Sequence, residues 1–400
     1  MKTITLARGR EKSLKRRHPW IFSGAVARVD GAPGAGETVR VLDASGQFLA
    51  LAAWSPNSQI RARVWRFDEG PVDAAFLEAR IAAALALRAQ LPAARHSNAL
   101  RLVHGESDGL PGLVVDRYAD IVVAQFLSCG AEHWRDTLLE TLFAQTGCEA
   151  LYERSDAEVR ALEGLEPRAG WVRRAEGTAA APGAGRCPIV ENGLNFRVDV
   201  EAGQKTGFFL DQRDNRQRVR ALAGGRRVLD AFCYTGGFAV AALAGGAQRV
   251  LALDSSAPAL EVARENAAAN GFEGDRATFL QADVFAHLRK LRDMGESFEL
   301  VVLDPPKFAP TAAQAQNAAR AYKDINLLAF KLLAPGGLLA TFSCSGGVPA
   351  ALFQSIVAGA ALDAGAEAKI LERFGAAADH PVALPFPEGD YLKGLLILRS

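Results

Sequence analysis

One stretch constrains the fold of this 400-residue chain more than any other, the run Arg227–Phe238 with the sequence RVLDAFCYTGGF. It combines a short apolar strand over Val228–Asp230, a turn that carries Gly236 and Gly237, and a helix-forming run over Ala239–Ala244. Glycine lets the backbone approach a ligand closely, and the start of a helix offers unpaired N–H groups. The stretch therefore predicts the first strand, turn and helix of an α/β sheet that binds a nucleotide or nucleoside.

Three further apolar strands follow, and an acidic residue stands at the end of each one. We expect them over 249–254, 277–285 and 298–306, with the acids Asp254, Asp283 and Asp304. Asp254 lies 24 positions after Asp230 (254 − 230), close to the spacing at which a carboxylate reaches a ribose hydroxyl pair. Ligands of open α/β sheets bind at the carboxyl ends of the strands. A single acid there is usually a helix cap, but four together predict a ligand site.

The glycine pattern separates two cofactors. A dinucleotide site carries Gly-x-Gly-x-x-Gly against a pyrophosphate, whereas here Asp230 precedes the glycines and no third glycine follows. A carboxylate at the strand end suits a ligand with an amine and a positive charge, and S-adenosylmethionine (SAM) carries an α-amine and a sulfonium. The stretch therefore resembles the class I SAM-dependent methyltransferases.

This resemblance implies a set of cofactor contacts. Asp230 and Gly236 line the methionine end, Asp254 holds the ribose hydroxyls, Asp283 with Val284 or Phe285 borders the adenine, and Asp304 faces the transferred methyl group. The remaining residues assigned to the cofactor are Phe232, Tyr234, Thr235, Ser255, Gln204, Lys205, Phe209 and Asp211.

Charge is distributed unevenly along the chain. The net charge is +1, so no global field indicates a nucleic-acid partner, but residues 1–28 hold eight basic side chains against one acid, Glu11, a local charge of +7. This cluster is either a solvated terminus or a nucleic-acid contact, and the interleaved aromatic residues favour the contact. The expected RNA-binding residues are Lys15, Arg16, Arg17, His18 and Trp20.

The five cysteines are widely spaced and form no CxxC pair, so neither a zinc site nor a disulfide framework is expected, and no metal is assigned. There is no signal peptide and no apolar run near 18 residues, so we expect a soluble cytoplasmic protein that does not contact a membrane.

Three domains are expected in an α/β chain. Residues 1–70 contain short, partly alternating strands between Gly- and Pro-bearing turns, which predict a small β-barrel. Residues 71–188 predict a middle α/β domain that ends in an Ala-, Gly- and Pro-rich linker over 175–188, and residues 189–400 hold the cofactor domain. The polar segment Gly203–Arg216 leads into the first strand of that domain, where it is either a lid over the cofactor or a surface loop.

Cys344 ends the strand that follows the Asp304 strand, so both residues should reach the same sheet edge. A thiolate beside a methyl donor is what carbon methylation of a pyrimidine needs, because its attack at C6 makes C5 nucleophilic. Asp304 would contact the base edge or share in proton transfer. His380, next to Asp379, is either a base or part of a structural turn.

Several runs together resemble one family, the large-subunit ribosomal RNA cytosine-C5 methyltransferase I group. They are Lys15–Phe22, Gly105–Gly112, Gln204–Arg213, Asp230–Phe238, Asp304–Phe308 and Phe342–Ser345. The resemblance implies an N-terminal PUA domain, a middle α/β domain and a C-terminal class I (Rossmann-like) methyltransferase domain. It implies methylation of C5 of a cytidine in 23S ribosomal RNA, or in a large-subunit precursor, with SAM as cofactor and Cys344 as nucleophile. A homodimer is considered as a partner state, although the sequence does not indicate the oligomeric state.

Two other functions stay open at this stage. One is N-methylation of a guanosine of the 7-methylguanosine type, a reaction that needs no thiolate. The other is a non-catalytic RNA-binding ribosome assembly factor, which the four strand-end acids disfavour. The family pattern is also broken after Ser-Cys-Ser, where this chain has Gly346-Gly347-Val348.

Overall fold

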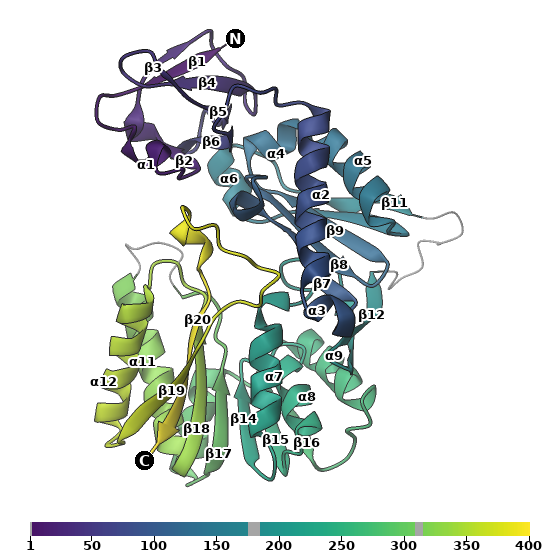
Figure 1. The fold of residues 1–400 in the computed structure, drawn as a ribbon. Helices are drawn as coiled ribbons and strands as arrows, with labels where there is room; N and C mark the ends of the chain where they lie inside the picture. The colour runs from purple at the N-terminus through teal and green to yellow at the C-terminus, as the bar shows by residue number, and fades with distance from the viewer. Residues whose placement is uncertain (1, 175–184, 309–314) are drawn as a thin grey trace. The chain divides into compact units, whose positions relative to one another are not determined.

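The computed structural model describes residues 2–174, 185–308 and 315–400, which form two compact units (Figure 1). The first unit comprises Met1–Ile189, Val198–Leu210 and Ala378–Gly389, and the second comprises Val190–Arg197, Asp211–Ala377 and Asp390–Ser400. Most of the predicted linker over 175–188 lies outside the described residues. The sequence also predicts a helix over 311–333, and its first residues, 311–314, lie outside the described residues as well. The bounds predicted for the three domains stay predictions.

A six-stranded sheet forms the N-terminal part of the first unit. Its strands are β1 (Thr3–Leu6), β2 (Trp20–Phe22), β3 (Val26–Asp30), β4 (Thr38–Leu42), β5 (Phe48–Trp54) and β6 (Ile60–Arg66), with the short helix α1 (Lys12–Lys15) after β1. The strand order is β2-β6-β5-β4-β1-β3, and β1 runs parallel to β4. Ile4, Val39 and Val41 are fully buried because alternate side chains of each strand point into one core.

A five-stranded sheet forms the middle part of the first unit, in the order β11-β10-β9-β8-β7. Its elements are β7 (Ala99–His104), β8 (Leu113–Tyr118), β9 (Ile121–Phe126), β10 (Ala150–Ser155) and β11 (Arg168–Arg174), with helices α2 (Ala74–Gln90), α3 (Ala93–His96), α4 (Cys129–His133), α5 (Arg135–Thr146) and α6 (Val159–Glu163). Helix α2 begins where the Asp73 side chain accepts a hydrogen bond from the Phe76 N–H (2.9 Å). Leu77 and Ile81 of α2 are fully buried against this sheet.

The second unit is built on a seven-stranded sheet with the order β16-β15-β14-β17-β18-β20-β19. Its strands are β14 (Arg227–Ala231), β15 (Arg249–Asp254), β16 (Ala277–Gln281), β17 (Phe298–Leu303), β18 (Leu333–Ser343), β19 (Ala368–Phe374) and β20 (Lys393–Arg399). Strands β14 to β18 run parallel to one another, whereas β20 pairs antiparallel with both β18 and β19. The chain leaves β14 toward β15 on one side and returns to β17 on the other, so the strand order reverses at β14.

Helices cover both faces of this sheet (Figure 1). They are α7 (Arg213–Leu222), α8 (Gly237–Ala244), α9 (Ala257–Ala268), α10 (Val284–Asp293), α11 (Ala315–Leu332) and α12 (Ala350–Asp363). Two separate apolar cores result, one holding Val219 and Leu260 of α7 and α9, the other Leu288, Ile325 and Phe353 of α10, α11 and α12. A two-stranded sheet, β12 (Arg186–Glu191) and β13 (Leu194–Asp199), precedes α7.

Two expected strands are shorter than the sequence predicted. The strand expected over 298–306 ends at Leu303, and the strand expected over 277–285 ends at Gln281, with α10 beginning at Val284. The Asp283 side chain accepts a hydrogen bond from the Ala286 N–H (2.7 Å), so this acid caps a helix as well as standing at the sheet edge.

In the part of the chain that the structure describes, no helix has both the length and the apolar character needed to cross a membrane.

Candidate active site

The site forms at the carboxyl edge of the seven-stranded sheet, where the strand order reverses at β14. Such a reversal opens a crevice outside the strand ends, which is where ligands of α/β sheets bind. Asp230, near the end of β14, is 1% exposed, and neither of its carboxylate oxygens accepts a hydrogen bond of good geometry from the described residues. Burial, with a smaller contribution from the nearby Asp304 carboxylate, raises the pKa of Asp230 from 3.8 to about 8.

A buried acid without a partner is costly unless something else pairs with it. A ligand that carries a positive charge or an amine would satisfy Asp230, so the residues present fit the methionine end of SAM.

The turn after β14 has an unusual backbone. Phe232, Tyr234 and Gly236 all have positive φ angles, of 65°, 49° and 77°. For bulky side chains this conformation is rare and persists only where surrounding contacts hold it. A Cβ atom added to Gly236 would lie 3.0 Å from the Ala263 Cβ, so the turn packs closely on α9. The turn is therefore held in one conformation, as a ligand cradle requires.

Asp254 is one of the groups that hold this turn. Its Oδ2 accepts a hydrogen bond from the Tyr234 N–H (2.8 Å), and its Oδ1 accepts one from the Ser256 N–H (2.9 Å). Each carboxylate oxygen has a second lone pair, so these contacts leave acceptor capacity for ribose hydroxyls. Ser255 and Asp283 are exposed beside this edge, Val284 is buried, and Thr235 is buried with no hydrogen-bond partner for its Oγ1 in the described chain.

Cys344 lies at the same sheet edge, one strand beyond Asp304. Leu303 of β17 pairs with Thr341 of β18, so the residues that follow these two strands emerge side by side. Cys344 is half-buried, and its neighbours Ser343 and Ser345 are buried. The sequence prediction that Cys344 and Asp304 share one edge is thus confirmed by the strand register.

Two residues that the sequence did not single out surround the cysteine. The Tyr322 hydroxyl of α11 accepts a hydrogen bond from the Ser343 hydroxyl (2.9 Å) and lies 2.9 Å from the Ser345 hydroxyl. The Lys393 Nζ of β20 donates to the Ser345 carbonyl (2.7 Å). The only signal for Lys393 was its position as the one lysine in an apolar strand whose other charged residue, Arg399, lies at its far end.

A row of aromatic rings connects the cofactor turn with the cysteine. The ring centroids of Phe232 and Phe285 are 5.9 Å apart, those of Phe285 and Phe308 are 6.0 Å apart, and those of Phe308 and Tyr322 are 4.9 Å apart. The rings are tilted by 75°, 48° and 60° to one another, so the row is an apolar wall but not a flat one, and Tyr322 at its end is fully buried.

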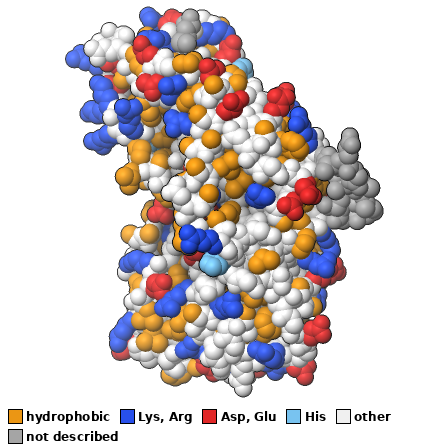
Figure 2. All heavy atoms as spheres, turned by 45° about the vertical axis from the view of Figure 1, so that its right-hand side comes forward, with side chains coloured by type: hydrophobic (Ala, Val, Ile, Leu, Met, Phe, Trp, Pro, Cys, Tyr) orange, Lys and Arg blue, Asp and Glu red, His pale blue; other side chains and the backbone are white. Residues whose placement is uncertain are grey.

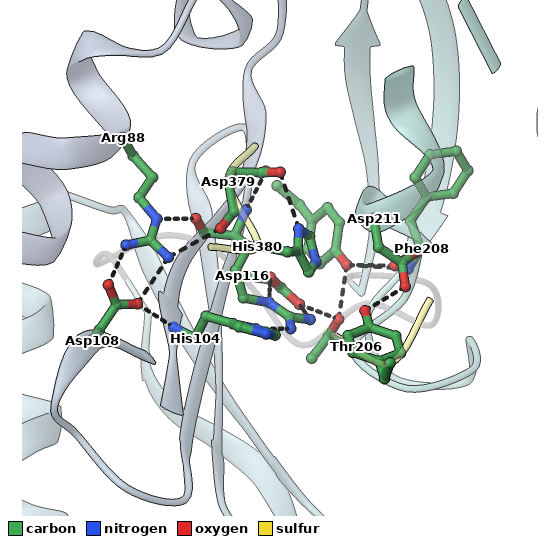
Figure 3. Close-up of polar contacts among 12 residues, drawn as sticks. Arg88, His104, Asp108, Asp116, Thr206, Phe208, Asp211, Asp379 and His380 are labelled. Atoms are coloured by element: carbon green, nitrogen blue, oxygen red, sulfur yellow. Dashed lines mark hydrogen bonds and ion pairs between the residues drawn. The ribbon is translucent and has the colours of Figure 1, made fainter. Parts of the chain in front are cut away.

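The predicted base His380 lies in the first unit, where it is 4% exposed. Its Nδ1 is 3.0 Å from Asp379 Oδ1, while Asp379 Oδ2 accepts from the Arg101 N–H (2.9 Å) and the Asp379 carbonyl accepts from Arg88 (3.0 Å) (Figure 3). Arg88 also forms a two-point ion pair with Asp108, at 2.6 and 2.8 Å. These contacts are those of an anchored turn, and the catalytic role of His380 stays a prediction.

The segment interpreted as a lid is anchored within the first unit at Thr206. The Thr206 hydroxyl donates to Asp116 Oδ2 (2.6 Å) and lies 2.9 Å from the Tyr118 hydroxyl, which also accepts from the Phe208 N–H (3.1 Å) (Figure 3). Thr206 is 1% exposed, so its contacts with Asp116 and Tyr118 are shielded from solvent.

The cofactor residues expected in this segment divide between the two units. Gln204 and Lys205 are exposed in the first unit, where the Lys205 ammonium lies 4.6 Å from the Phe209 ring centroid. Asp211 is buried in the second unit and accepts a hydrogen bond from the Tyr391 hydroxyl (2.5 Å). Their contacts with SAM stay predictions.

The expected RNA-binding residues lie on and after α1. Lys15, Arg16 and Arg17 are exposed, whereas His18 and Trp20 are half-buried. The Trp20 indole donates to a Glu106 carboxylate oxygen (2.8 Å), so this side chain serves the internal packing of the first unit as well. Figure 2 shows Lys and Arg side chains gathered at the upper left, over the part of the first unit that holds the N-terminal sheet.

The fold and this sheet edge define a SAM-dependent methyltransferase. The family model described as S-adenosylmethionine-dependent methyltransferase matches residues 179–388, and the model of a PUA-like domain matches residues 4–67. The chain belongs to the ribosomal RNA large subunit methyltransferase I family. Members from Erwinia tasmaniensis and Tolumonas auensis are each 51% identical to it, over 98% and 99% of this chain and 98% of their own.

Two solved structures share the whole fold at low sequence identity. A protein from Streptococcus mutans assigned to the SAM-dependent methyltransferases covers 100% of both chains with a TM-score of 0.85 and 20% identity. A methyltransferase structure that contains SAH covers 100% of both chains with a TM-score of 0.86 and 20% identity.

Proposed function

We propose that this chain transfers the methyl group of SAM to C5 of a cytidine in 23S ribosomal RNA, with Cys344 as the nucleophile. The observation that carries the proposal is the half-buried cysteine at the same sheet edge as Asp304 and the unpaired acid Asp230. The names of the relatives support a large-subunit ribosomal RNA as substrate.

Asp230 and the turn that ends at Gly236 would hold the methionine end of SAM, Asp254 and Ser255 the ribose, and Asp283 with Val284 the adenine. When bound there, SAM supplies an electrophilic methyl group. Asp230 would then exist as a carboxylate paired with the positive end of the cofactor, which removes the cost of its burial.

The chemistry of the base follows from the thiolate. The Cys344 sulfur would form a bond to C6 of the cytosine as the C5=C6 π pair shifts to C4–C5 and the C4=N3 π pair shifts to N3, which makes C5 the nucleophilic carbon of an enamine. C5 would then take the methyl group as the S–CH3 bond of SAM breaks, with SAH as the leaving group. A base then removes the C5 proton, the C5=C6 double bond forms again, and the sulfur leaves as a thiolate. Asp304, which follows the neighbouring strand at the same sheet edge, is a candidate for this base.

The target base must leave its stack to reach this edge. The half-buried rings of Phe232, Phe285 and Phe308 would offer apolar contacts for a nucleoside, and the exposed Lys15, Arg16 and Arg17 would offer charge for the RNA backbone. A cytoplasmic location and a homodimeric state stay predictions.

The experiment maps base methylation in 23S RNA by mass spectrometry, in cells that lack this protein and are complemented with variants. The wild-type gene should restore one 5-methylcytosine, and Cys344→Ala should not. Cys148→Ala is the matched control, because this cysteine lies buried in the first unit and should leave the mark intact. Loss of a methylated guanosine, or a 5-methylcytosine that survives Cys344→Ala, would contradict the proposal and favour N-methylation or another nucleophile.

A further inference from the structure

The second unit places one lysine directly beside the proposed nucleophile. Lys393 begins β20 and pairs with Ser343, the residue before Cys344, in the antiparallel β18–β20 register. Residues directly opposite each other in an antiparallel pair project to the same face of the sheet, so the lysine lies next to the end of β18. The register therefore fixes where its side chain starts.

The Lys393 ammonium closes the turn that follows the cysteine. It donates to the carbonyl of Ser345 (2.7 Å) and to the carbonyl of Val348 (2.8 Å). Since an ammonium has three donors, these two bonds leave one N–H for another acceptor at this turn. Tyr322 holds the opposite side of the same turn through the hydroxyls of Ser343 and Ser345. The backbone on both sides of Cys344 is thus fixed by two side chains from other elements.

The charges around the cysteine come from several elements. The acidic groups are the Asp304 carboxylate after β17 and the Asp390 carboxylate before β20, and the Tyr322 hydroxyl lies on α11. The cationic groups are Lys393 and Lys307, of which Lys307 is exposed and Lys393 is half-buried. Burial lowers the pKa of Lys393, whereas the Cys344 sulfur acts in the opposite direction and favours the ammonium. The interaction is reciprocal, so the ammonium favours the thiolate.

We propose that Lys393 is a positioning residue that holds the turn after Cys344 and stabilises the thiolate of that cysteine by its charge. This proposal rests on the proposed function, in which Cys344 attacks C6. Ionisation transfers the thiol proton to solvent, and the sulfur keeps the electron pair that later forms the bond to carbon. Thiolates are favoured beside lysine or arginine in other proteins for the same electrostatic reason.

The test measures alkylation of Cys344 by iodoacetamide in the full chain, without SAM or RNA, between pH 6 and 9.5. Mass spectrometry of the Cys344 peptide gives the rate for the wild type, Lys393→Met and Lys393→Arg, and circular dichroism verifies that each variant is folded. Only the thiolate reacts, so Lys393→Met should react about tenfold more slowly near neutral pH and reach its half-maximal rate at higher pH. Lys393→Arg keeps the positive charge and should restore most of the rate.

An unchanged pH profile in folded Lys393→Met would overturn the proposal, even if methylation were lost, because the lysine would then only hold the turn. A slow Lys393→Arg variant would overturn it as well, since charge would not be the property that matters. Methylation that survives Cys344→Ala would contradict the proposed function, but the alkylation profile would still report whether Lys393 favours the thiolate. The two failures are therefore distinguishable.

Discussion

Asp230 is the residue whose replacement gives the sharpest prediction. Its pKa is raised from 3.8 to about 8 by burial, so the folded chain without cofactor keeps the proton on this carboxyl while the unfolded chain releases it. The stability that this protonated acid contributes is fully present below pH 3.8 and is lost as the pH rises toward 8. The free energy of unfolding should therefore fall with rising pH through this window.

The magnitude follows from the size of the shift. One pKa unit corresponds to about 1.36 kcal/mol, and roughly three units separate 3.8 from pH 7. The free energy of unfolding of the wild type should therefore be about 4 kcal/mol lower at pH 7 than below pH 3.8. Asp230→Asn has a similar shape and does not titrate. The variant without cofactor should be more stable than the wild type by about 4 kcal/mol at pH 7, by more than that at pH 8, and equal to it near pH 4.

Asp230→Asn should weaken cofactor binding, although it stabilises the folded chain without cofactor. The carboxylate pairs with the positive end of the cofactor, and a charge-assisted bond of this kind contributes about 1.5–3 kcal/mol, so Asp230→Asn should bind SAH roughly 10- to 100-fold more weakly. The affinity of the wild type should also rise between pH 6 and 8, because binding requires the proton to leave.

The assays are urea unfolding at pH 4, 7 and 8 and calorimetric titration with SAH at pH 6 and 8.5. A variant that is less stable than the wild type at pH 8 would refute the account of Asp230 burial. A variant that binds SAH as tightly as the wild type would refute the role of the carboxylate in the cofactor site.

Three further perturbations test other parts of the structure. Glu191→Gln leaves two buried arginines of α7 without their carboxylate and should destabilise the chain by about 3–5 kcal/mol in urea unfolding. Arg17→Ala removes an exposed charge and should weaken RNA binding equally for all sequences, lowering the slope of log K against log salt by about one in fluorescence titrations. Gly245→Ala places a Cβ 1.9 Å from the Arg220 carbonyl oxygen and should cost more than about 2 kcal/mol, whereas Gly375→Ala meets no atom within 4 Å and should be nearly neutral.

The parts of the fold that were predictable from the sequence are those with local signals. The run Arg227–Phe238 forms β14, its turn and the start of α8, because an apolar strand, two glycines and helix-forming residues stand side by side in the chain. The strand ending at Asp254 was predicted with its observed bounds for the same reason. Cys344 and Asp304 could be placed at one edge because parallel strands end at the same side of a sheet.

The missed elements depend on partners that are distant in the chain. Strand β10 (Ala150–Ser155) is entirely buried although it contains Glu153 and Arg154, two charged residues that interrupt the apolar pattern of the strand. The Glu153 carboxylate is paired with Arg135, 18 residues earlier, and the Arg154 guanidinium donates to the Val200 carbonyl, 46 residues later. Charges that are satisfied in this way cannot be recognised as buried from the sequence alone.

Prediction of the candidate site from the sequence fails for the same reason, because some of its contacts join residues that are distant in the chain. The acid at 283 was expected at the end of a strand, but it also caps α10, because local spacing cannot tell where a strand ends and a helix begins. Tyr322 and Lys393 reach the turn around Cys344 from α11 and β20, and only the antiparallel β18–β20 register brings the lysine there. A lone lysine in an apolar strand is a weak signal until that register is known.

The most direct test of the central claim is to trap the bond between Cys344 and the base. In an RNA that carries 5-fluorocytidine at the target position, the C5 position has no proton to remove, so the sulfur cannot leave after methyl transfer. We predict that the purified chain, incubated with this RNA and SAM, forms a stable adduct whose mass spectrum places the nucleotide on the Cys344 peptide, and that Cys344→Ser forms none. An adduct on another residue, or methylated RNA with no adduct, would contradict the account.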